Sequence, residues 1–333
     1  MRVLVVSDAW RPQVNGVVRT LEMTQREAGV LGHTMAVIGP ERFRTVPMPG
    51  YPSIRLAVLP GRTLARMITV FRPDALHVAT EGPLGWAARR WARRHGLAFT
   101  TSFHTRFPEY LHARARVPPR LTYAWLRRFH NSGAGTMAAT PSLCRTLAQQ
   151  GFSVLLPWSR GVDLDVFHPG AAEDWPYPRP ILLYVGRLAV EKDLPGFLAL
   201  DLPGTKVVIG DGPLRAALQA AYPDAVFAGE RHGPALARAY AGADVFVFPS
   251  RTDTFGLVLL ESLACGTPVA AHDVTGPADV LAGAAGCVGA LDTDLRAAVL
   301  RALGADRAAC RAHAERFSWR ACTETFLANL AAP

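Results

Sequence analysis

One stretch, residues 244–271, constrains the fold of this chain more than any other; it reads DVFVFPSRTDTFGLVLLESLACGTPVAA. The apolar, β-branched and aromatic run Val245–Phe248 predicts a buried strand. Gly256–Cys265 is typical of a short helix that ends at Gly266, where a left-handed residue is favoured. Thr267–Ala271 predicts a further strand. A strand–loop–helix–strand unit of this kind indicates a parallel α/β sheet, in which ligands bind at the carboxyl ends of the strands.

Two carboxylates of this stretch, Asp253 and Glu261, are candidate site residues. Glu261 is surrounded by leucines, and a carboxylate in such a place is costly to bury without a partner. It could accept hydrogen bonds from a pair of ligand hydroxyls, such as those of a ribose, or occupy an ordinary exposed helix position. Asp253, in the loop, could face a ligand or cap the helix that follows. The residues alone leave these alternatives open.

Two loops in the first half of the chain also follow predicted strands. The opening run RVLVVS predicts a strand, and the loop after it ends at Asn15 and Gly16, where a helix begins. Gly16 could let backbone N–H groups approach an anion, or be a turn residue only. Phe99–Phe103 predicts a strand with His104 at its carboxyl end, where α/β sheets build their sites. A lone histidine is otherwise more often structural.

A similar loop follows the predicted strand Ile181–Val185 and begins with Gly186. Its two cations, Arg187 and Lys192, could converge on one phosphate group, since their charge adds to the helix dipole there. As isolated basic residues they would instead be solvated. Further along, the glycines of Gly210–Pro213 permit close backbone approach.

Together these segments resemble the retaining nucleotide-sugar glycosyltransferases of family 4, which have the GT-B fold. The resemblance rests on S-x-x-D-x-F-G-x-x-x-x-E-x-x-A-x-G-x-P-V from Ser250, on G-R-L-x-x-x-K-D from Gly186 and on S-x-H-T-x-F-P-x-Y from Ser102. The family commonly has Glu where this chain has Asp253. The segment around His104 is similar to that of transferases that add mannosyl, glycosyl or sulfoquinovosyl groups to lipids.

The resemblance implies an α/β GT-B architecture, with two Rossmann-like domains facing across a cleft. We expect an N-terminal, acceptor-side domain over residues 1–165 and a C-terminal, nucleotide-sugar-binding domain over residues 166–315. Residues 316–333 should form a helix that returns to the N-terminal domain. The stretch Trp158–Asp163 resembles the inter-domain segment of the family.

The resemblance also implies the site. The catalytic residues would be His104, Asp253, Arg187 and Lys192. The donor-binding residues would be Asn15, Gly16, Gly186, Arg187, Lys192, Gly212, Arg231, Thr254, Phe255, Gly256 and Glu261. Arg187 and Lys192 would stabilise the departing nucleotide diphosphate, because charge develops on both fragments.

We expect no cofactor and no metal, the nucleotide sugar being the donor substrate. Asp292 and Asp294 have the spacing of a metal-binding pair, but they precede a predicted helix and are interpreted as capping residues. The family retains the anomeric configuration without an established enzyme nucleophile. A same-face attack, in which a donor phosphate oxygen takes the acceptor proton, is therefore the mechanism that the resemblance favours.

Charge is distributed unevenly along the chain. Residues 1–165 hold 22 Lys and Arg against 9 Asp and Glu, whereas the whole chain has a net charge of +9. The predicted helices 86–95 and 120–130 combine arginine with aromatic and apolar residues, a mixture expected on anionic lipid headgroups. We favour a membrane glycerolipid as acceptor, with a soluble sugar or polysaccharide as the alternative. Nucleic acid is disfavoured, because the charge is dispersed without a recognisable nucleic-acid module.

Five scattered cysteines without metal-ligand spacing favour a reducing, cytoplasmic location. The basic first half adds the expectation of peripheral contact with the inner face of a membrane. No apolar run approaches the ~20 residues that span a bilayer. Two other functions fit the same fold. One is a nucleotide-sugar epimerase, which lacks this acidic signature, and the other is a non-catalytic nucleotide-sugar-binding protein, which need not retain Arg187, Lys192 and Glu261.

Overall fold

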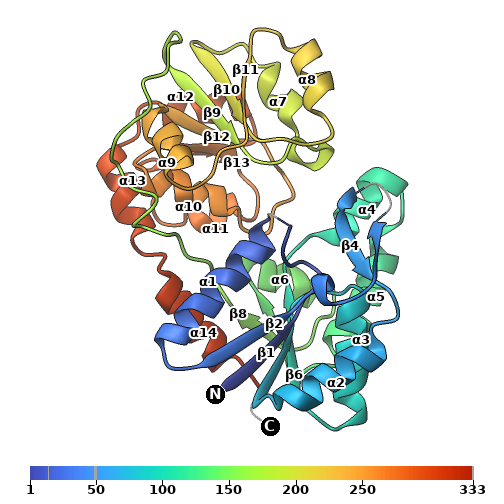
Figure 1. The fold of residues 1–333 in the computed structure, drawn as a ribbon. Coiled ribbons are helices and arrows are strands. Elements are labelled where there is room, and N and C mark those ends of the chain that lie inside the picture. Colours follow the sequence, from blue (N-terminus) through green and yellow to red (C-terminus); the bar gives the residue numbers. More distant parts are fainter. Residues whose placement is uncertain (14, 49–50, 332–333) are drawn as a thin grey trace. The chain divides into compact units, whose positions relative to one another are not determined.

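The computed structural model describes residues 1–13, 15–48 and 51–331 and consists of two compact units (Figure 1). Unit 1 comprises Met1–Arg160 and the segment from Trp319 onward, and unit 2 comprises Gly161–Ser318. The sequence predicts boundaries at residues 165 and 315, whereas the chain crosses between units at residues 160 and 318. The first crossing comes early because Trp158 and Arg160 are both buried within unit 1.

Unit 1 is built on a six-stranded parallel sheet. Its strand order is β2 (Thr34–Ile38), β1 (Arg2–Val6), β5 (Ala75–Val78), β6 (Phe99–Phe103), β7 (Gly135–Ala138) and β8 (Leu155–Pro157). The inner strands β1, β5, β6 and β7 are short and almost wholly buried, as parallel strands covered by helices must be, whereas the edge strands β2 and β8 are partly exposed. The chain order reverses beside β1, which has β2 on one side and β5 on the other.

Helices and one hairpin surround this sheet. The helices are α1 (Gly16–Val30), α2 (Gly61–Phe71), α3 (Pro83–Arg94), α4 (Phe107–Ala115), α5 (Pro119–His130), α6 (Pro141–Gln149) and α14 (Trp319–Ala328), with a 3₁₀ turn η1 (Pro40–Arg42). The antiparallel hairpin pairs β3 (Thr45–Met48) with β4 (Tyr51–Ala57). The C-terminal helix α14 packs against α1, although the whole of unit 2 separates them in sequence (Figure 1).

Unit 2 repeats the plan with another six-stranded parallel sheet. Its order is β11 (Val226–Gly229), β10 (Thr205–Ile209), β9 (Ile181–Val185), β12 (Val245–Phe248), β13 (Val269–His272) and β14 (Gly289–Asp292). Numbered within the unit, this is the order 3-2-1-4-5-6 of a Rossmann sheet. Its topological switch point therefore lies between β9 and β12.

The helices of unit 2 follow its strands. They are α7 (Leu194–Leu198), α8 (Arg215–Ala221), α9 (Gly233–Gly242), α10 (Leu257–Ala264), α11 (Pro277–Val280), α12 (Leu295–Ala302) and α13 (Arg307–Ala314), with a 3₁₀ turn η2 (Val190–Lys192). The apolar side chains of β9, β10 and β12 form one core with α7 and α12. In the described parts of both units, no helix is both long and apolar enough to cross a bilayer.

Candidate active site

The switch point of unit 2 brings together two loops that are far apart in sequence. One follows β9 and contains Gly186–Asp193, and the other follows β12 and contains Ser250–Gly256. Because β9 and β12 are paired in the sheet, their carboxyl ends lie side by side. This is the place where open α/β sheets bind ligands.

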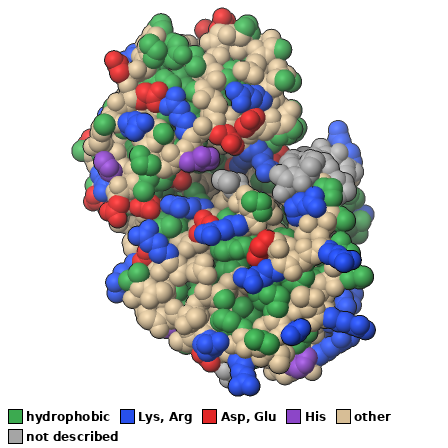
Figure 2. All heavy atoms as spheres, in the orientation of Figure 1, with side chains coloured by type: hydrophobic (Ala, Val, Ile, Leu, Met, Phe, Trp, Pro, Cys, Tyr) green, Lys and Arg blue, Asp and Glu red, His purple; other side chains and the backbone are tan. Residues whose placement is uncertain are grey.

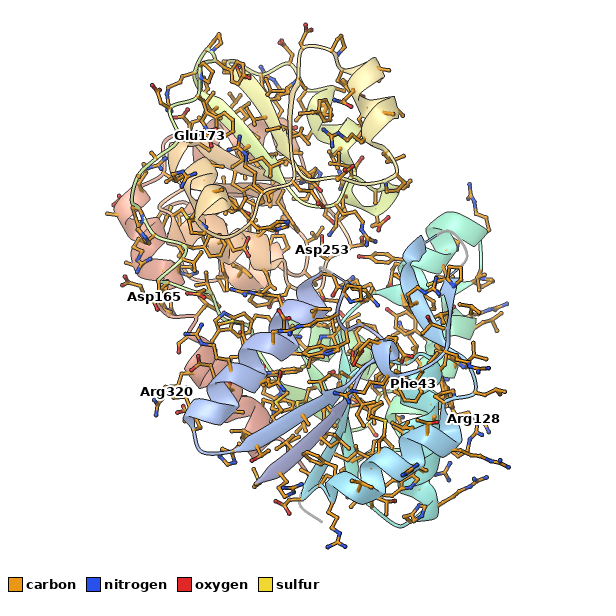
Figure 3. All side chains as sticks on the ribbon, in the orientation of Figure 1. Phe43, Arg128, Asp165, Glu173, Asp253 and Arg320 are labelled. Atoms are coloured by element: carbon orange, nitrogen blue, oxygen red, sulfur yellow. The ribbon has the colours of Figure 1, made fainter. Side chains whose placement is uncertain are left out.

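The two loops are joined by an ion pair between Lys192 and Asp253, the latter labelled in Figure 3. The Lys192 ammonium donates to both carboxylate oxygens of Asp253, at 2.6 and 2.7 Å. The side chains of Lys192 and Asp253 are 20% and 16% exposed, so the pair is partly shielded from solvent but still accessible to it. The Lys192 ammonium also lies 6.0 Å from the centroid of the Phe248 ring. A cation at the switch point is thus held in a fixed place.

The loop after β9 is held by hydrogen bonds at both of its ends. The Tyr184 hydroxyl donates to the Arg187 carbonyl at 2.9 Å, and Ser250 Oγ donates to the Glu191 carbonyl at 3.3 Å. Burial raises the pKa of Tyr184 well above its ordinary value, so this donor keeps its proton. Arg187 and Lys192 therefore project from a backbone whose course is fixed.

Close packing requires a glycine at position 212, in addition to the donor-binding role that is predicted for it. Its φ is +159°, and a Cβ there would lie 2.5 Å from the Leu188 carbonyl oxygen. The Leu188 N–H donates to the Asp211 carbonyl at 2.9 Å. The glycine turn therefore lies directly against the loop after β9, with no room for a side chain.

Glu261 lies on α10 and is neither fully buried nor fully exposed. The Tyr240 hydroxyl donates to its Oε2 at 3.3 Å. The helix begins one residue later and ends one residue earlier than predicted, because Gly256, at φ +86°, forms its N-cap. The Asp253 side chain therefore does not cap this helix. Phe255 is buried and lies 6.4 Å, between ring centroids, from Phe317.

Arg231 has partners within unit 2. Its guanidinium pairs with Glu173 (labelled in Figure 3) and lies 4.9 Å from the centroid of the Trp175 ring. A donor contact by Arg231 would have to share or replace these partners. That contact, like the one predicted for Thr254, stays a prediction.

In unit 1, at the end of the sheet where the strands have their carboxyl ends, Asn15 is the N-cap of α1. Its Oδ1 accepts hydrogen bonds from the N–H groups of Val17 and Val18, both at 3.0 Å. The side chain is therefore engaged in starting the helix. An anion at this helix start could use Gly16, whose side is open to solvent.

His104 follows β6 and has partners at both ring nitrogens. Nε2 lies 2.8 Å from Ser102 Oγ, and Nδ1 lies 3.1 Å from a guanidinium nitrogen of Arg160. Burial, and then the charge of Arg160, hold the pKa of His104 well below its ordinary value. The imidazole is neutral at physiological pH and is unsuited to act as a general acid.

Sequence reasoning missed two charged residues near the carboxyl ends of the strands of unit 1. Arg160 lay in a segment that we interpreted only as a crossing between domains. Asp8, at the carboxyl end of β1, accepts hydrogen bonds from the N–H groups of Leu84 and Gly85 at the start of α3. Its signal was a charged residue directly after an apolar strand.

The described residues contain no group of three or more His, Cys, Asp or Glu side chains that could hold a metal ion. Asp294 caps α12 by accepting from the Arg296 N–H at 2.9 Å, which confirms its interpretation as a capping residue. Asp292 accepts from the Asp294 N–H at 3.0 Å and pairs with Arg301.

Comparison with known proteins places this arrangement in a class. Residues 14–201 match the sequence model described as Glycosyltransferase Family 4, and residues 179–305 match the one described as Glycosyl transferases group 1. Sucrose-phosphate synthase from Thermosynechococcus elongatus has the same fold, with a TM-score of 0.78, 18% identity and 98% of each chain covered.

Two relatives are similar over most of their length. A GDP-mannose-dependent alpha-mannosyltransferase of Mycobacterium tuberculosis is 34% identical over 84% of this chain and 81% of its own. A GDP-mannose-dependent alpha-(1-6)-phosphatidylinositol dimannoside mannosyltransferase of the same species is 30% identical over 100% of this chain and 96% of its own.

The two Rossmann-like units have the GT-B fold, as predicted. Within that fold class, the chain belongs to glycosyltransferase family 4.

Proposed function

We propose that this enzyme transfers a hexosyl group, with retention of configuration, from GDP-mannose or a UDP-hexose to a hydroxyl of a membrane glycerolipid. The names of its relatives support a GDP-mannose donor and a lipid acceptor. The observation that carries the proposal is the fixed cation at the switch point of unit 2, where Asp253 holds Lys192 at 2.6 and 2.7 Å.

The chemistry follows from the charge that must be stabilised. As the bond to the sugar breaks, negative charge grows on the departing nucleotide diphosphate. A cation that is already in place stabilises this charge without reorganising at the moment of reaction. Lys192, supported by Arg187 on the same loop, supplies such charge.

In this reaction Asp253 is a positioning residue. Its carboxylate orients the Lys192 ammonium in the free enzyme, while the backbone of Asp253–Phe255 lines the sugar site. Glu261 accepts hydrogen bonds from the ribose hydroxyls. No residue is assigned as a nucleophile, and a donor phosphate oxygen takes the proton of the acceptor hydroxyl. The enzyme uses no metal or other cofactor.

The acceptor is inferred from a surface of unit 1 that we name the arginine surface. It consists of the exposed residues Arg90, Arg93 and Arg94 on α3 and Arg120, Arg127 and Arg128 on α5. Neither helix contains an acidic residue. Blue side chains predominate over red on the face of unit 1 that is visible in Figure 2.

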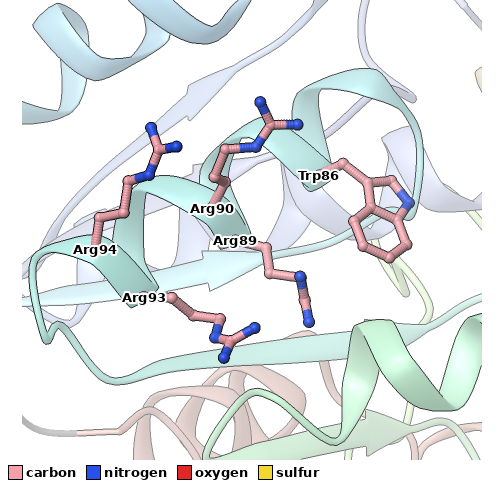
Figure 4. A pocket seen from close by; sticks show the side chains of 5 residues that line it. All are labelled: Trp86, Arg89, Arg90, Arg93 and Arg94. Carbon is pink, nitrogen blue, oxygen red and sulfur yellow. The ribbon is translucent and has the colours of Figure 1, made fainter.

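Apolar side chains accompany this charge. Leu121 and Trp125 on α5 are 59% and 41% exposed, and the Trp125 ring lies 5.5 Å from that of Trp86 on α3. On α3, a surface hollow of about 420 Å³ is lined by Trp86 and four arginines, which extend to both sides of the helix (Figure 4). Exposed aromatic and apolar groups among cations suit an interface with anionic headgroups. We therefore place the enzyme at the cytoplasmic face of a membrane.

The test begins with thermal-shift screening of the full chain against UDP, GDP and ADP sugars. The best donor is then incubated with lipid extract and, separately, with soluble sugars, and products are identified by mass spectrometry. We expect glycosylated lipid, formed equally well in EDTA, and an α anomeric linkage when the purified product is examined by NMR. Glycosylation of soluble sugars only would contradict the lipid acceptor, and activity lost in EDTA and restored by Mn²⁺ would contradict the metal-free mechanism.

A variant tests the ribose contact within the same screen. Glu261→Gln keeps an oxygen that can accept from Tyr240, so the melting temperature without ligand should stay close to that of the wild type. Nucleotide binding should weaken, because a charged acceptor is replaced by a neutral one. Unchanged nucleotide affinity would remove Glu261 from the donor site.

A further inference from the structure

Arg160 is a buried arginine whose partners are all neutral. The residue is 5% exposed, and its guanidinium lies 4.5 Å from the centroid of the Trp158 ring. It donates to the carbonyls of Trp158 and Ser159 at 2.5 and 2.9 Å, and to His104 Nδ1 at 3.1 Å. Among the described residues it forms no ion pair. Such a charge is costly to bury, so its contact with a predicted catalytic histidine calls for a function.

The contact determines where the proton of His104 lies. A guanidinium nitrogen can only donate, so His104 Nδ1 must accept, and the ring proton is on Nε2. Nε2–H then donates to Ser102 Oγ at 2.8 Å. Ser102 in turn donates to the Ala79 carbonyl at 3.2 Å.

The neighbouring histidine fits the same arrangement. His77 Nε2 lies 3.0 Å from Ser102 Oγ, and its Nδ1 lies 2.9 Å from Thr100 Oγ1. Ser102 Oγ has two lone pairs, which accept from both histidines while its own proton goes to Ala79. One set of proton positions therefore satisfies the whole network, with both imidazoles neutral.

The charged and titratable groups around His104 act in the same direction. Besides Arg160, they are His77 on β5 and His130 at the end of α5, and each lowers the pKa of His104. His130 Nε2 itself contacts Glu81 at 3.0 Å. Cys322 on α14 donates to the Ser159 carbonyl at 3.0 Å, and its thiol pKa is raised to about 11, so it carries no charge at neutral pH.

We propose that Arg160 is a positioning residue for glycosyl transfer, which fixes His104 as the neutral Nε2–H tautomer and holds the ring in one orientation. This rests on the proposed function and on the resemblance to family 4, which implies that His104 faces the donor sugar. Positive charge develops on that sugar, so an imidazolium beside it would be repulsive. By keeping the ring neutral, Arg160 prevents this charge from appearing as the pH falls.

The direct test is nitrogen NMR of the ¹⁵N-histidine-labelled full chain, without substrates, with His104→Gln to assign the signal. In the wild type, Nδ1 of His104 should have the shift of an unprotonated nitrogen that does not titrate between pH 5.5 and 8. A protonated Nδ1 or a titration in this range would overturn the proposal. This readout does not depend on whether the enzyme transfers sugar.

Variants then test the part of Arg160. Arg160→Met removes the donor and the charge, so His104 should sample both tautomers and its pKa should rise toward the ordinary value. Arg160→Lys keeps a donor and a charge, and should restore the wild-type signal at least in part. Arg89→Met is the matched control, because Arg89 is also buried in unit 1 but donates to Ser132 and to the Arg128 carbonyl. It should leave the His104 signal unchanged.

Turnover completes the test. The kcat of Arg160→Met should acquire an acid limb that the wild type lacks, with a loss of up to about tenfold one pH unit below the new pKa of His104. A residue that only stabilised the fold would lower the melting temperature and leave the pH profile flat. A changed tautomer with an unchanged profile would overturn the part of Arg160 in the reaction. Absence of transfer by the wild type with every donor would instead count against the proposed function.

Discussion

Lys192 and Asp253 are separated by 61 residues in sequence, yet their side chains form the central contact of unit 2. In a chain with only two lysines, this one lies on a 3₁₀ turn after β9 and is aimed at the loop after β12. The two charges neutralise each other in the free enzyme. A nucleotide diphosphate therefore competes with Asp253 for an ammonium group that is already in position.

Replacing Lys192 with alanine should lower kcat/KM by about tenfold or more. Charged hydrogen bonds to phosphate are worth roughly 1.5–3 kcal/mol each, and 1.4 kcal/mol corresponds to a factor of ten in rate. The other lysine supplies a control, since the Lys206 ammonium donates to the carbonyls of Leu198 and Leu200, which lie outside these loops. Lys206→Met should keep its kcat/KM. Equal kcat/KM for the wild type and Lys192→Ala would remove Lys192 from the diphosphate site.

At the scale of whole elements, the strands were the most predictable part of the fold. The runs Phe99–Phe103 and Ile181–Val185 are strands β6 and β9 with the predicted bounds, and all residues of both strands are buried. Short runs rich in aromatic and β-branched residues between loops are typical of buried strands. The loops after β6 and β9 were also predicted as site segments. The side-chain partners were not, since Lys192–Asp253 and Arg160–His104 depend on which strands become neighbours in a sheet. Sequence spacing carries no record of that order.

The N-terminus of helix α3 is capped by a carboxylate from the loop after β1. Its N-cap, Gly82, has no side chain, and a Cβ there would lie 2.4 Å from Asp8 Cγ. Asp8 takes the place of a capping side chain and accepts from the N–H groups of Leu84 and Gly85 at 2.9 and 3.2 Å. Burial raises the pKa of Asp8 to about 6 despite these bonds.

The cost of Asp8→Asn should therefore depend on pH. Between its unfolded pKa of 3.8 and about 6, Asp8 holds its proton in the folded state but not in the unfolded state. Its contribution to stability thus falls as the pH rises through this window. Asparagine does not titrate, so the substitution should cost roughly 1–1.5 kcal/mol more at pH 5 than at pH 7.5. Urea unfolding of both proteins at the two pH values measures this difference, and a cost that shrinks at pH 5 would contradict it.

The arginine surface makes a prediction about its three exposed arginines on α3. Changing Arg90, Arg93 and Arg94 to glutamine should weaken co-sedimentation with liposomes that contain anionic lipid. The charge-matched control changes Arg238, Arg296 and Arg316, which are exposed on unit 2. Attraction to a charged surface is screened as the Debye length falls to ~8 Å at physiological salt, so the difference should be largest at low salt. Binding that ignores lipid charge, salt and the triple substitution would favour a soluble acceptor.

At the scale of the whole molecule, unit 2 is an insertion with its two ends side by side. Val162 and Ser318 form a β-bridge, and the Val162 N–H donates to the Phe317 carbonyl at 3.1 Å. The loop after β9, Asp253 and Glu261 all lie between these ends. The segment has its own sheet and core, which are the properties of an independently folding domain.

Residues 161–318 expressed alone should therefore fold and bind a nucleoside diphosphate within about tenfold of the affinity of the full chain, since a compact domain keeps its own core. Thermal unfolding followed by circular dichroism tests folding, and calorimetric titration tests binding. The same fragment with Lys192→Ala should bind more weakly. A folded fragment that does not bind would show that unit 1 supplies an essential part of the nucleotide site.

The position of α14 determines which unit can complete its folding first during synthesis. Phe326 on this helix lies 4.8 Å from the ring of Trp158 and 5.1 Å from that of His77, so the last helix of the sequence completes the first core of the protein. On the ribosome, the strands of unit 1 emerge first but must wait for all of unit 2 before Phe326 can cover them. We therefore expect unit 2, synthesised second, to finish folding first. Until then, the unfinished half is the one that needs protection from aggregation.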